Sequence, residues 1–373
     1  MIKNKIKRIL DSVNLLDLAQ DFSEKRYIKK LGKMLPKIKE TGLVEFPKVV
    51  VYEITARCNL DCQMCSVSSE FKKKQKHLNT EQVKKLIDHL PSSIETVILT
   101  GGEVFVRPDM IELLEHFKKK GINIHLTTNA TFLDEEIINK IHKLDVVIGG
   151  GVSIDGLEEL HNKIRRRDFA FKKATEGAKL MAKIFQTSLV CVVQADNLKE
   201  MPDIVKLAFK LGIKRVYFEY ERCYTKGDVE ESNKQLGMDI VSGLELSPKF
   251  KRDYSLDELN ATFKEVKKAG KKVGVKVKFF PYFLDKESKI CYDRTIRDKY
   301  NCICKGITSF RLDPLGNVIH CYGVRKVMGN LLTDSFDKIW NSEEYKKLRK
   351  LLINNNLLPI CETCLYQRLI SEK

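Results

Sequence analysis

One short run of cysteines constrains this chain more than any other feature of its sequence. Residues 58–65 are CNLDCQMC, which places Cys58, Cys62 and Cys65 in a CxxxCxxC spacing directly after a β-branched stretch. Three thiolates so close together can bind one metal assembly, and a set of only three protein ligands leaves one position of that assembly open for chemistry. Because structural zinc prefers four protein ligands in paired CxxC spacing, this run argues against a structural zinc site.

The composition is that of an ordinary globular chain. Its 373 residues are 43% hydrophobic and 31% charged, which excludes collagen-like and wholly disordered proteins. No stretch approaches about 18 consecutive apolar residues, and Asp11 and Asp17 interrupt the apolar positions of the N-terminus, so we expect neither a membrane-spanning helix nor a signal peptide. We therefore expect a cytoplasmic protein, in which thiols stay reduced and the clustered cysteines among its eleven serve as metal or cluster ligands.

The net charge is strongly positive, with 67 Lys and Arg against 50 Asp and Glu, or +17. Such an excess permits contact with nucleic acid, an anionic membrane or an acidic protein. The lysines are spread along the chain, which favours solvated helix faces, and no segment interleaves aromatic and basic residues, which disfavours nucleic acid. Residues 1–46 are predicted to form a basic helical leader docked on the body of the protein, and peripheral contact with a membrane stays open.

Between residues 47 and 220, short β-branched runs alternate with longer amphipathic stretches. This alternation predicts an α/β fold of βα units around a parallel sheet, either a partial (β/α)6 TIM-like barrel or an open doubly wound sheet. In both architectures the chemistry lies at the carboxyl ends of the strands. The predicted strands are 48–54, 96–99, 122–126, 146–153, 187–193 and 215–220, and the predicted helices are 80–90, 108–120, 134–142, 168–184 and 199–211.

The remaining sequence is predicted to form two further parts. Residues 221–290 bridge and close the barrel with an irregular polar stretch, a helix near 257–270 and a strand near 273–280. Residues 291–373 form a cysteine-rich extension with a hairpin at RLDPLGNVIHC, a helix near 335–353 and a closing CETC.

Glycines and polar side chains follow the predicted strands at the edge where the cysteine run lies. Glycine permits a close approach of the backbone to a bound group, and carboxylates and hydroxyls are natural partners of sugar hydroxyls. Taken singly, each motif is an ordinary strand-to-helix turn, but their order and placement form one constellation. Its members are Gly101, Gly102 and Glu103 after the second strand, Asn129 after the third, Ser153 and Asp155 after the fourth, Arg165 in the segment HNKIRR, and Val193 at the end of the fifth.

With these motifs the sequence resembles the radical S-adenosylmethionine (SAM) enzymes over residues 47–220. The resemblance implies that Cys58, Cys62 and Cys65 hold a 4Fe-4S cluster whose fourth iron binds SAM. Met64 stands where the family usually has an aromatic residue that covers the adenine, and it can still pack there. The resemblance also implies that the other motif residues bind SAM: Gly101, Gly102 and Glu103 near the methionine amino group, Ser153 and Asp155 at the ribose, Arg165 at the carboxylate, Val193 at the adenine, and Asn129 beside them.

The C-terminal cysteines resemble the SPASM/twitch extension found on one branch of that family. The resemblance implies that Cys304, Cys321, Cys361 and Cys364 ligate one auxiliary 4Fe-4S cluster, with Cys302 as a rival for the first position. The full SPASM pattern has a further cysteine shortly after CxxC, and residues 365–373 have none, so we expect the shorter single-cluster arrangement. A zinc knuckle on the same four cysteines is the alternative.

Three side chains near the end of the sixth strand are candidates for catalysis. Cys223 can donate a hydrogen atom to a substrate radical, as in some radical SAM epimerases, and Glu219 or Glu221 can accept a substrate proton if it points inward. Cys191, within the fifth strand, is predicted to be a buried apolar residue, and Cys291 receives no role.

The resemblance implies an enzyme that reductively cleaves SAM to a 5′-deoxyadenosyl radical, which abstracts a hydrogen atom from an unidentified substrate. A fully ligated auxiliary cluster suits electron relay, which favours oxidation or cross-linking of a small molecule, peptide or lipid. The basic surface fits an acidic ferredoxin- or flavodoxin-type reductant. Two alternatives stay open: an RNA-modifying radical SAM enzyme, which predicts salt-sensitive RNA binding, and a non-catalytic iron-sulfur or zinc-binding protein.

Overall fold

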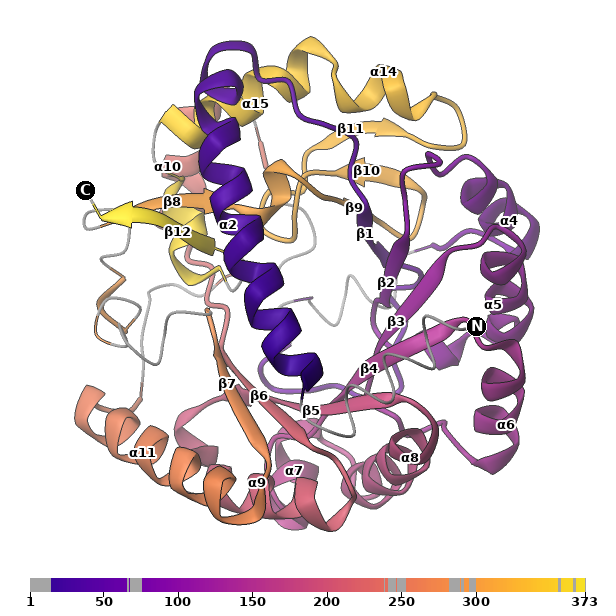
Figure 1. Ribbon diagram of the computed structural model, residues 1–373, viewed down its shortest axis with the longest axis vertical. Coiled ribbons are helices and arrows are strands. Elements are labelled where there is room, and N and C mark those ends of the chain that lie inside the picture. Colours follow the sequence, from indigo (N-terminus) through magenta and orange to yellow (C-terminus); the bar gives the residue numbers. More distant parts are fainter. Residues whose placement is uncertain are drawn as a thin grey trace.

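The computed structural model shows a curved sheet wrapped on its outside by helices (Figure 1). Residues 15–25, 27–28, 300–305, 363 and 367–372 are described by their backbone alone. The structure describes residues 15–65, 67, 76–237, 239–240, 246, 253–281, 289, 292–294, 300–354, 357–364 and 367–372.

Parallel strands β1 to β7 form the wall of a partial barrel. They lie in the sheet in chain order, each hydrogen-bonded to the next. Successive side chains point to opposite faces, so that Val97 and Leu99 are fully buried in the core while Ile98 between them is partly exposed on the inner face. The predicted α/β partial barrel is confirmed. Its strands are β1 (Val49–Glu53), β2 (Thr96–Thr100), β3 (Asn123–Thr128), β4 (Val147–Ser153), β5 (Gln186–Val193), β6 (Arg215–Tyr220) and β7 (Lys276–Phe280).

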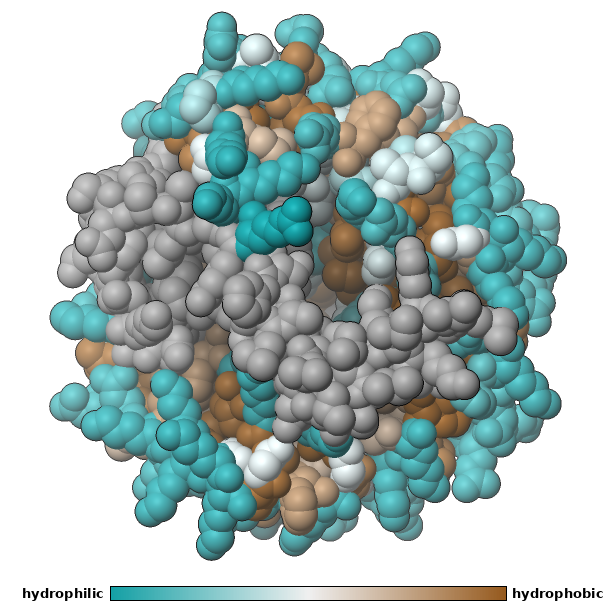
Figure 2. Space-filling view, in the orientation of Figure 1, coloured by the Kyte–Doolittle hydropathy of each residue, from teal (hydrophilic) through white to brown (hydrophobic). Residues whose placement is uncertain are grey.

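Helices connect these strands and cover the outer face of the sheet, with α4, α5 and α6 along one side of the view in Figure 1. Figure 2 shows hydrophilic side chains over the outer surface of that side, as expected for lysines on solvated helix faces. The elements are α4 (Thr80–Asp88), η1 (Val104–Val106), α5 (Met110–Lys119), α6 (Glu135–Leu144), α7 (Glu158–Arg165), α8 (Ala170–Ile184), η2 (Ala195–Glu200), α9 (Met201–Lys210), α10 (Lys226–Leu236) and α11 (Leu256–Val273).

Two of these helices, α7 and α10, were not predicted. Leu157 at the start of α7 makes no side-chain cap, so the sequence carries no starting signal there. Helix α10 does carry one, because Thr225 Oγ1 accepts from Asp228 N at 3.0 Å and the Asp228 carboxylate accepts from Thr225 N at 3.4 Å. This capping box shows that part of the predicted irregular stretch is helical.

The C-terminal hairpin joins the barrel sheet rather than standing apart. Strand β9 (Phe310–Leu312) pairs in parallel with β1, and β10 (Asn317–Ile319) and β11 (Val327–Asn330) continue the sheet in antiparallel fashion. The order of the described strands is therefore β11-β10-β9-β1-β2-β3-β4-β5-β6-β7. The hairpin covers the edge of β1, and this places the C-terminal extension next to the strand that leads into the CxxxCxxC run.

The rest of the extension consists of short elements. The helix predicted near 335–353 is divided, because Ser342 Oγ accepts from Tyr345 N at 3.2 Å and caps a new helix. The elements are β8 (Tyr300–Cys304), η3 (Lys305–Ile307), α14 (Phe336–Trp340), α15 (Glu343–Asn354), η4 (Pro359–Thr363) and β12 (Gln367–Glu372), with β8 and β12 paired antiparallel.

The leader docks on the C-terminal extension. Its helix α2 (Leu15–Thr41) packs against α15 and β12, and Trp340 Nε1 donates to the carbonyl oxygens of Val44 and Glu45 at 3.2 Å each. Arg349 is fully buried, with its guanidinium 4.0 Å from the Trp340 ring centroid and its Nη1 donating to Gly42 O at 3.2 Å. Its charge thus lies at the carbonyl end of α2, where a cation is favoured. No helix in the described part of the chain is long and apolar enough to cross a membrane.

Candidate active site

The CxxxCxxC run follows β1 directly. The residues just before its first cysteine are hydrogen-bonded to the end of β2. Gly102 N donates to Thr55 O at 2.8 Å and Glu103 N donates to Arg57 O at 2.9 Å. A Cβ on Gly102 would lie 2.1 Å from Arg57 O, and one on Gly101 would lie 2.1 Å from Thr55 O. Because no side chain fits there, both glycines allow the cysteine loop to rest on β2. Their contact with SAM stays a prediction.

Buried Glu103 ties the end of β2 to the end of β3. Its Oε1 accepts from Thr128 Oγ1 at 2.7 Å and from Phe105 N at 3.2 Å, and its Oε2 accepts from Asn129 N at 2.7 Å. Burial raises the pKa of this carboxyl, against the effect of these hydrogen bonds. Asn129 in turn places its Nδ2 3.9 Å from Cys58 Sγ. Glu103 therefore positions the end of β3 against the first cysteine.

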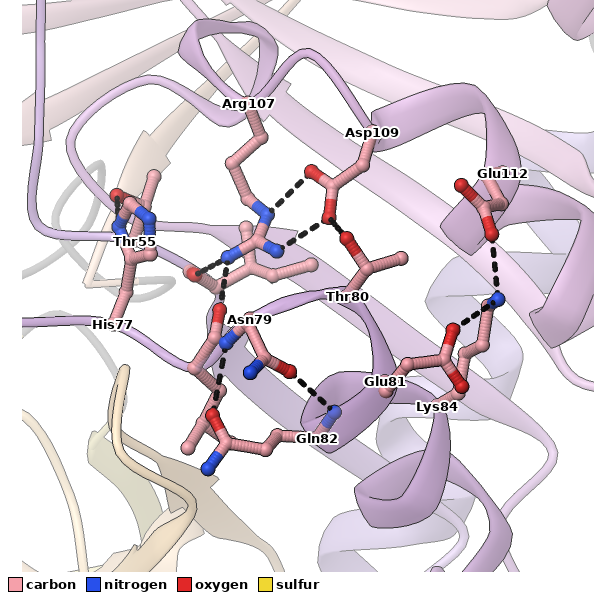
Figure 3. A network of polar contacts seen from close by, with 12 residues as sticks. Thr55, His77, Asn79, Thr80, Glu81, Gln82, Lys84, Arg107, Asp109 and Glu112 are labelled. Atoms are coloured by element: carbon pink, nitrogen blue, oxygen red, sulfur yellow. Dashed lines mark hydrogen bonds and ion pairs between the residues drawn. The ribbon is translucent and has the colours of Figure 1, made fainter.

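Arg107 belongs to a network of polar contacts next to the end of β1 (Figure 3). It is buried, and its Nη1 donates to Leu78 O at 2.9 Å and to Ile54 O at 3.4 Å, at the point where β1 leads into the loop. Its Nε and Nη2 bind the Asp109 carboxylate at 3.0 and 2.7 Å, and Thr80 Oγ1 donates to the same carboxylate at 2.7 Å. The backbone before Cys58 is thereby fixed by a paired and satisfied charge.

Helix α7 contacts the loop from the other side. Gln63 N donates to Ile164 O at 2.9 Å. The buried Arg165 then donates from Nη1 to Cys62 Sγ at 3.5 Å, and its Nη2 pairs with Asp155 Oδ2. The structure therefore brings the motifs after β2, β3 and β4 together around one cysteine loop.

Asp155 is fully buried and holds Arg165 in place. Its Oδ1 accepts from Val192 N at 2.9 Å, its backbone N donates to His161 Nδ1 at 3.1 Å, and its backbone O accepts from Asn197 Nδ2 at 3.0 Å. Burial and Arg165 hold the pKa of His161 well below its ordinary value, so this imidazole is a neutral acceptor. The closed surroundings of Asp155 disfavour direct contact of its carboxylate with a ribose, which the family resemblance implied.

The other residues expected to contact SAM differ in exposure. Val193 is only 1% exposed and belongs to the core, so its side chain offers little surface to an adenine ring. Ser153 and Met64 are partly exposed, next to the contacts just described. Their expected contacts with ribose and adenine stay predictions.

Three C-terminal cysteines line one cavity of about 70 Å³. Cys361 and Cys364 come from η4 and the position after it, where Ile360 N donates to Ser232 Oγ of α10 at 3.1 Å. Cys321 follows β10, and its Sγ accepts from Val324 N at 3.3 Å. The same cavity is lined by Val49, Val51 and Ile98 of β1 and β2, by Phe310 and Arg311 of β9, and by Arg222, Tyr224 and Tyr322. The side chains of Cys302 and Cys304, and all of Cys291, lie outside the described residues.

A buried charge cluster connects this cavity to β1. Glu53 Oε1 accepts from Arg311 Nη1 at 2.9 Å and from Arg325 Nη1 at 3.1 Å, and its Oε2 accepts from Arg325 Nη2 at 2.9 Å. Burial acts to raise the pKa of Glu53, but the two guanidiniums lower it below its ordinary value. No role was predicted for Glu53, Arg311 or Arg325. The available signal was a charged residue in each of two otherwise apolar strand segments, VVVYE and FRL.

The donors of both cysteine sets suit iron-sulfur clusters. Cys58, Cys62 and Cys65 supply one set of thiolates, and Cys321, Cys361 and Cys364 line the other site. Iron-sulfur clusters are held by cysteine thiolates. Among the described residues, no group of three or more His, Cys, Asp and Glu side chains is arranged to hold a single metal ion.

The candidate catalytic residues lie at the end of β6. Glu219 lies on the inner face of the sheet; burial raises the pKa of its carboxyl, Arg222 opposes this and Asp155 adds to it. Glu221 and Cys223 follow the strand and are partly exposed. Cys191 is fully buried, as predicted, and Asn197 Nδ2 donates to its Sγ at 3.5 Å. Of the three candidates, Glu219 has the surroundings that suit proton transfer.

Comparison with known proteins gives two matching family models. One is described as the radical SAM superfamily and covers residues 52–208; the other, SPASM, is described as an iron-sulfur cluster-binding domain and covers residues 302–365. The AdoMet-dependent heme synthase of Methanosarcina barkeri is 27% identical over 88% of this chain and 91% of its own length. The Fe-coproporphyrin III synthase of the same organism is 32% identical, over 53% of this chain and 50% of its own length.

Among solved structures, Streptococcus suis SuiB bound to its precursor peptide SuiA has a similar fold. The likeness covers 93% of this chain and 80% of that chain, with a TM-score of 0.62 at 15% identity, so it concerns the fold alone. The expected cofactors, SAM and 4Fe-4S clusters, are confirmed by the two family models. This chain belongs to the radical SAM superfamily of enzymes, in the branch that carries a C-terminal SPASM iron-sulfur domain.

Proposed function

We propose that this enzyme oxidises an apolar organic molecule that carries an acidic group, bound between the barrel wall and the cysteine cavity. Cys58, Cys62 and Cys65 would hold the cluster at which SAM binds, and the bound SAM would supply a 5′-deoxyadenosyl radical able to remove a hydrogen atom from the substrate. A second cluster on Cys321, Cys361, Cys364 and one of Cys302 or Cys304 would then take up an electron. The observation that carries this proposal is the cavity that Cys321, Cys361 and Cys364 share with the inner face of β1.

The lining of the cavity indicates the substrate class. Most of its wall is apolar or aromatic, and the rings of Tyr224 and Tyr322 stack with centroids 6.4 Å apart. The guanidinium of Arg222 lies 4.8 Å from the centroid of the Tyr322 ring. An apolar substrate body would pack against the rings, and its carboxylate or phosphate would pair with an arginine.

One relative favours a small molecule, although others, such as the PqqA peptide cyclase of Bradyrhizobium diazoefficiens, act on peptides by name. The relative that aligns over 91% of its own length is a heme synthase, and hemes are flat apolar rings with carboxylate side chains. A porphyrin would use both the apolar lining and the charge of the cavity if one of its carboxylates were inserted beside Arg222. Glu219, on the inner face of β6, would accept a proton released from the substrate as it is oxidised.

The electron donor is proposed to be an acidic ferredoxin- or flavodoxin-type protein of the cytoplasm. The net charge of +17 supports this, because opposite charges on the two proteins would speed their encounter. SAM cleavage driven by such a reductant should slow as salt increases, whereas cleavage driven by a small chemical reductant should not. Equal salt dependence of both reactions would argue against the electrostatic dock.

Iron counting combined with SAM cleavage tests the reaction. Anaerobically reconstituted protein should hold about eight irons per chain, and a variant with Cys58, Cys62 and Cys65 changed to Ala should hold about four. That variant should also form no 5′-deoxyadenosine under a strong reductant. About four irons in the unaltered protein, with zinc in addition, would remove the auxiliary cluster from the mechanism.

Titration with Fe-coproporphyrin III tests the substrate class. Binding, followed by the porphyrin absorbance, should weaken at least tenfold in Arg222→Gln, because one charge-assisted contact is worth about 1.5–3 kcal/mol. Arg166→Gln is the matched control, since it removes the same charge from a side chain that is 53% exposed. Equal affinities of the two variants, or tighter binding of an apolar peptide, would contradict the proposal.

A further inference from the structure

We infer that Arg165 and Asp155 form a pair that sets the reduction potential of the cluster held by Cys58, Cys62 and Cys65. In this role Arg165 hydrogen-bonds a cluster thiolate, and Asp155 positions the guanidinium and offsets its charge. The inference rests on the proposed cluster at these cysteines, and it does not depend on the identity of the substrate.

Arg165 contacts a cysteine of the CxxxCxxC run directly. Arg165 Nη1 lies 3.5 Å from Cys62 Sγ and donates to it. Hydrogen bonds to the cluster sulfurs and the net charge around them are two of the main factors that set iron-sulfur potentials. A cation that donates to a thiolate stabilises the reduced cluster, which is more negative than the oxidised one by one charge. The Arg165 contact should therefore raise the potential.

The Arg165 guanidinium is held rigidly by Asp155. Arg165 is 8% exposed and Asp155 is fully buried, and the two side chains are paired through Nη2 and Oδ2. The other carboxylate oxygen of Asp155 is bonded to Val192 N at 2.9 Å. Both carboxylate oxygens of Asp155 are engaged. Arg165 can therefore change its contact with Cys62 only by breaking a buried ion pair.

The helix that carries Arg165, α7, has its C-terminal end next to the cysteine loop. This residue is the last of α7, and Ile164 O, at the same end, accepts from Gln63 N of the cysteine loop at 2.9 Å. The carbonyl end of a helix has a partial negative charge and disfavours a neighbouring anion. A cluster at Cys62 would meet this end of α7, and Arg165 supplies the positive charge that counteracts it.

The neighbouring residue provides a control within the same loop contact. Arg166 Nη1 lies 3.5 Å from Asp61 Oδ2, and their side chains are 53% and 41% exposed. Solvent screens this pair, so its charge should affect the cluster far less than the buried charge of Arg165. Replacement of either arginine removes one positive charge next to the CxxxCxxC run.

The experiment is a potentiometric titration of anaerobically reconstituted protein, followed by electron paramagnetic resonance without SAM or substrate. The variant with Cys58, Cys62 and Cys65 changed to Ala provides the auxiliary signal, which is subtracted. In Arg165→Gln the reduced-to-oxidised ratio of the remaining cluster at a fixed potential should fall about tenfold, or about 59 mV for one electron. Arg166→Gln should change it less than threefold, and Arg165→Lys should restore part of the loss.

Asp155→Asn should shift the reduction potential of the cluster in the direction opposite to Arg165→Gln, so it provides a second, independent test. Removal of the offsetting carboxylate should raise the reduced fraction at the same potential. If Arg165→Gln fails to load iron, this variant decides alone: a rise supports the inference, and no change or a fall overturns it. Equal midpoints in Arg165→Gln and Arg166→Gln would also overturn it.

SAM binding separates this role from the one that the family resemblance implied. If Arg165 only binds the SAM carboxylate, Arg165→Gln will weaken SAM affinity and leave the midpoint of the SAM-free cluster unchanged, which would refute the inference. Failure of the proposed substrate oxidation would have a different signature. It would leave the midpoints of all these variants in the expected order, because no substrate is present in the titration.

Discussion

Buried arginine and carboxylate side chains lie beside both cysteine sets of this chain. The two sets differ in the number of guanidiniums per carboxylate. Beside Cys62, one guanidinium and one carboxylate are paired, and the guanidinium also contacts the sulfur. Beside the C-terminal cavity, Arg311 and Arg325 share the single carboxylate of Glu53, and Cys321 Sγ accepts from a backbone amide. The first arrangement is balanced, whereas the second has one surplus positive charge.

This difference shows how one strand can serve two sites. Glu53 is the last residue of β1, so the strand that leads into the CxxxCxxC run also fixes the hairpin that carries Cys321. Around Cys62 the structure controls one sulfur directly, through Arg165. Around Cys321 it controls the relative position of two chain segments. The N-terminal set is therefore contacted directly at a sulfur, whereas the C-terminal set is joined to β1 through the hairpin that carries Cys321.

The largest expected effect comes from removal of the C-terminal ligands. Cys361→Ser combined with Cys364→Ser should lose about four irons and keep SAM cleavage, because the N-terminal loop keeps its own contacts. Substrate oxidation should fall more than about 100-fold, since an electron would have no acceptor. Iron analysis and 5′-deoxyadenosine measurements check both effects. Loss of SAM cleavage as well would show that the two sets act as one unit.

Glu53→Gln should have the next largest effect. It leaves two buried guanidiniums with no carboxylate between them, and breaking a buried ion pair in this way typically costs about 3–5 kcal/mol. The control is Glu45→Gln, because Glu45 pairs with Lys30 at 2.7 Å while 71% exposed. Its expected cost is under about 1 kcal/mol in the free energy of unfolding. Equal denaturant midpoints for the two variants would mean that the Glu53 cluster does not hold the sheet.

One glycine from each region gives a smaller and sharper contrast. Gly102→Ala would place a Cβ 2.1 Å from Arg57 O, whereas Gly323→Ala would place one 3.4 Å from the Tyr224 ring, at ordinary contact distance. Overpacking of this kind costs roughly 1–3 kcal/mol. We expect Gly102→Ala to lower iron retention in the N-terminal set and Gly323→Ala to load normally. If Gly323→Ala retained less iron than Gly102→Ala, the close contact between the cysteine loop and β2 would not be needed to hold the cluster.

The smallest expected effect concerns Glu219, which interacts with the charges of both regions. Burial raises its pKa, Arg222 lowers it and Asp155 raises it. A carboxyl with a raised pKa binds more protons in the folded state, so its contribution to stability is lost as pH rises from the ordinary carboxyl range through the folded pKa. Glu219→Gln should remove this decline in unfolding free energy. An unchanged pH profile would place Glu219 outside the influence of both regions.

Local patterns predicted most of the barrel, because each βα unit has its own signals. Runs such as VVVYE and TVILT favour strands, and the amphipathic segments between them favour helices. The motifs after these strands were placed correctly at one edge, because parallel strands present all their carboxyl ends together. These are properties of short segments, which a sequence displays directly.

Pairings between distant segments could not be predicted in the same way. Nothing in the residues of β9 specifies β1 as its neighbour, and the bond between Arg311 and Glu53 joins positions 258 residues apart. Asp155 and Arg165 were both assigned to the cofactor, because the sequence shows their chemistry but not that they pair with each other. The side chains of Cys302 and Cys304 lie outside the described residues, so the choice between these two ligands stays a prediction.

The position of the hairpin also determines when the protein can finish folding. Strand β1 leaves the ribosome well before residues 310–312, with which one of its edges pairs. Trp340 likewise reaches back to the carbonyl oxygen of Val44, 296 residues earlier. Until residues 310–312 have been made, a valine-rich strand therefore has an open edge, which invites pairing with other chains. A truncated barrel without the hairpin should aggregate, and slow translation should make the nascent enzyme depend on chaperones.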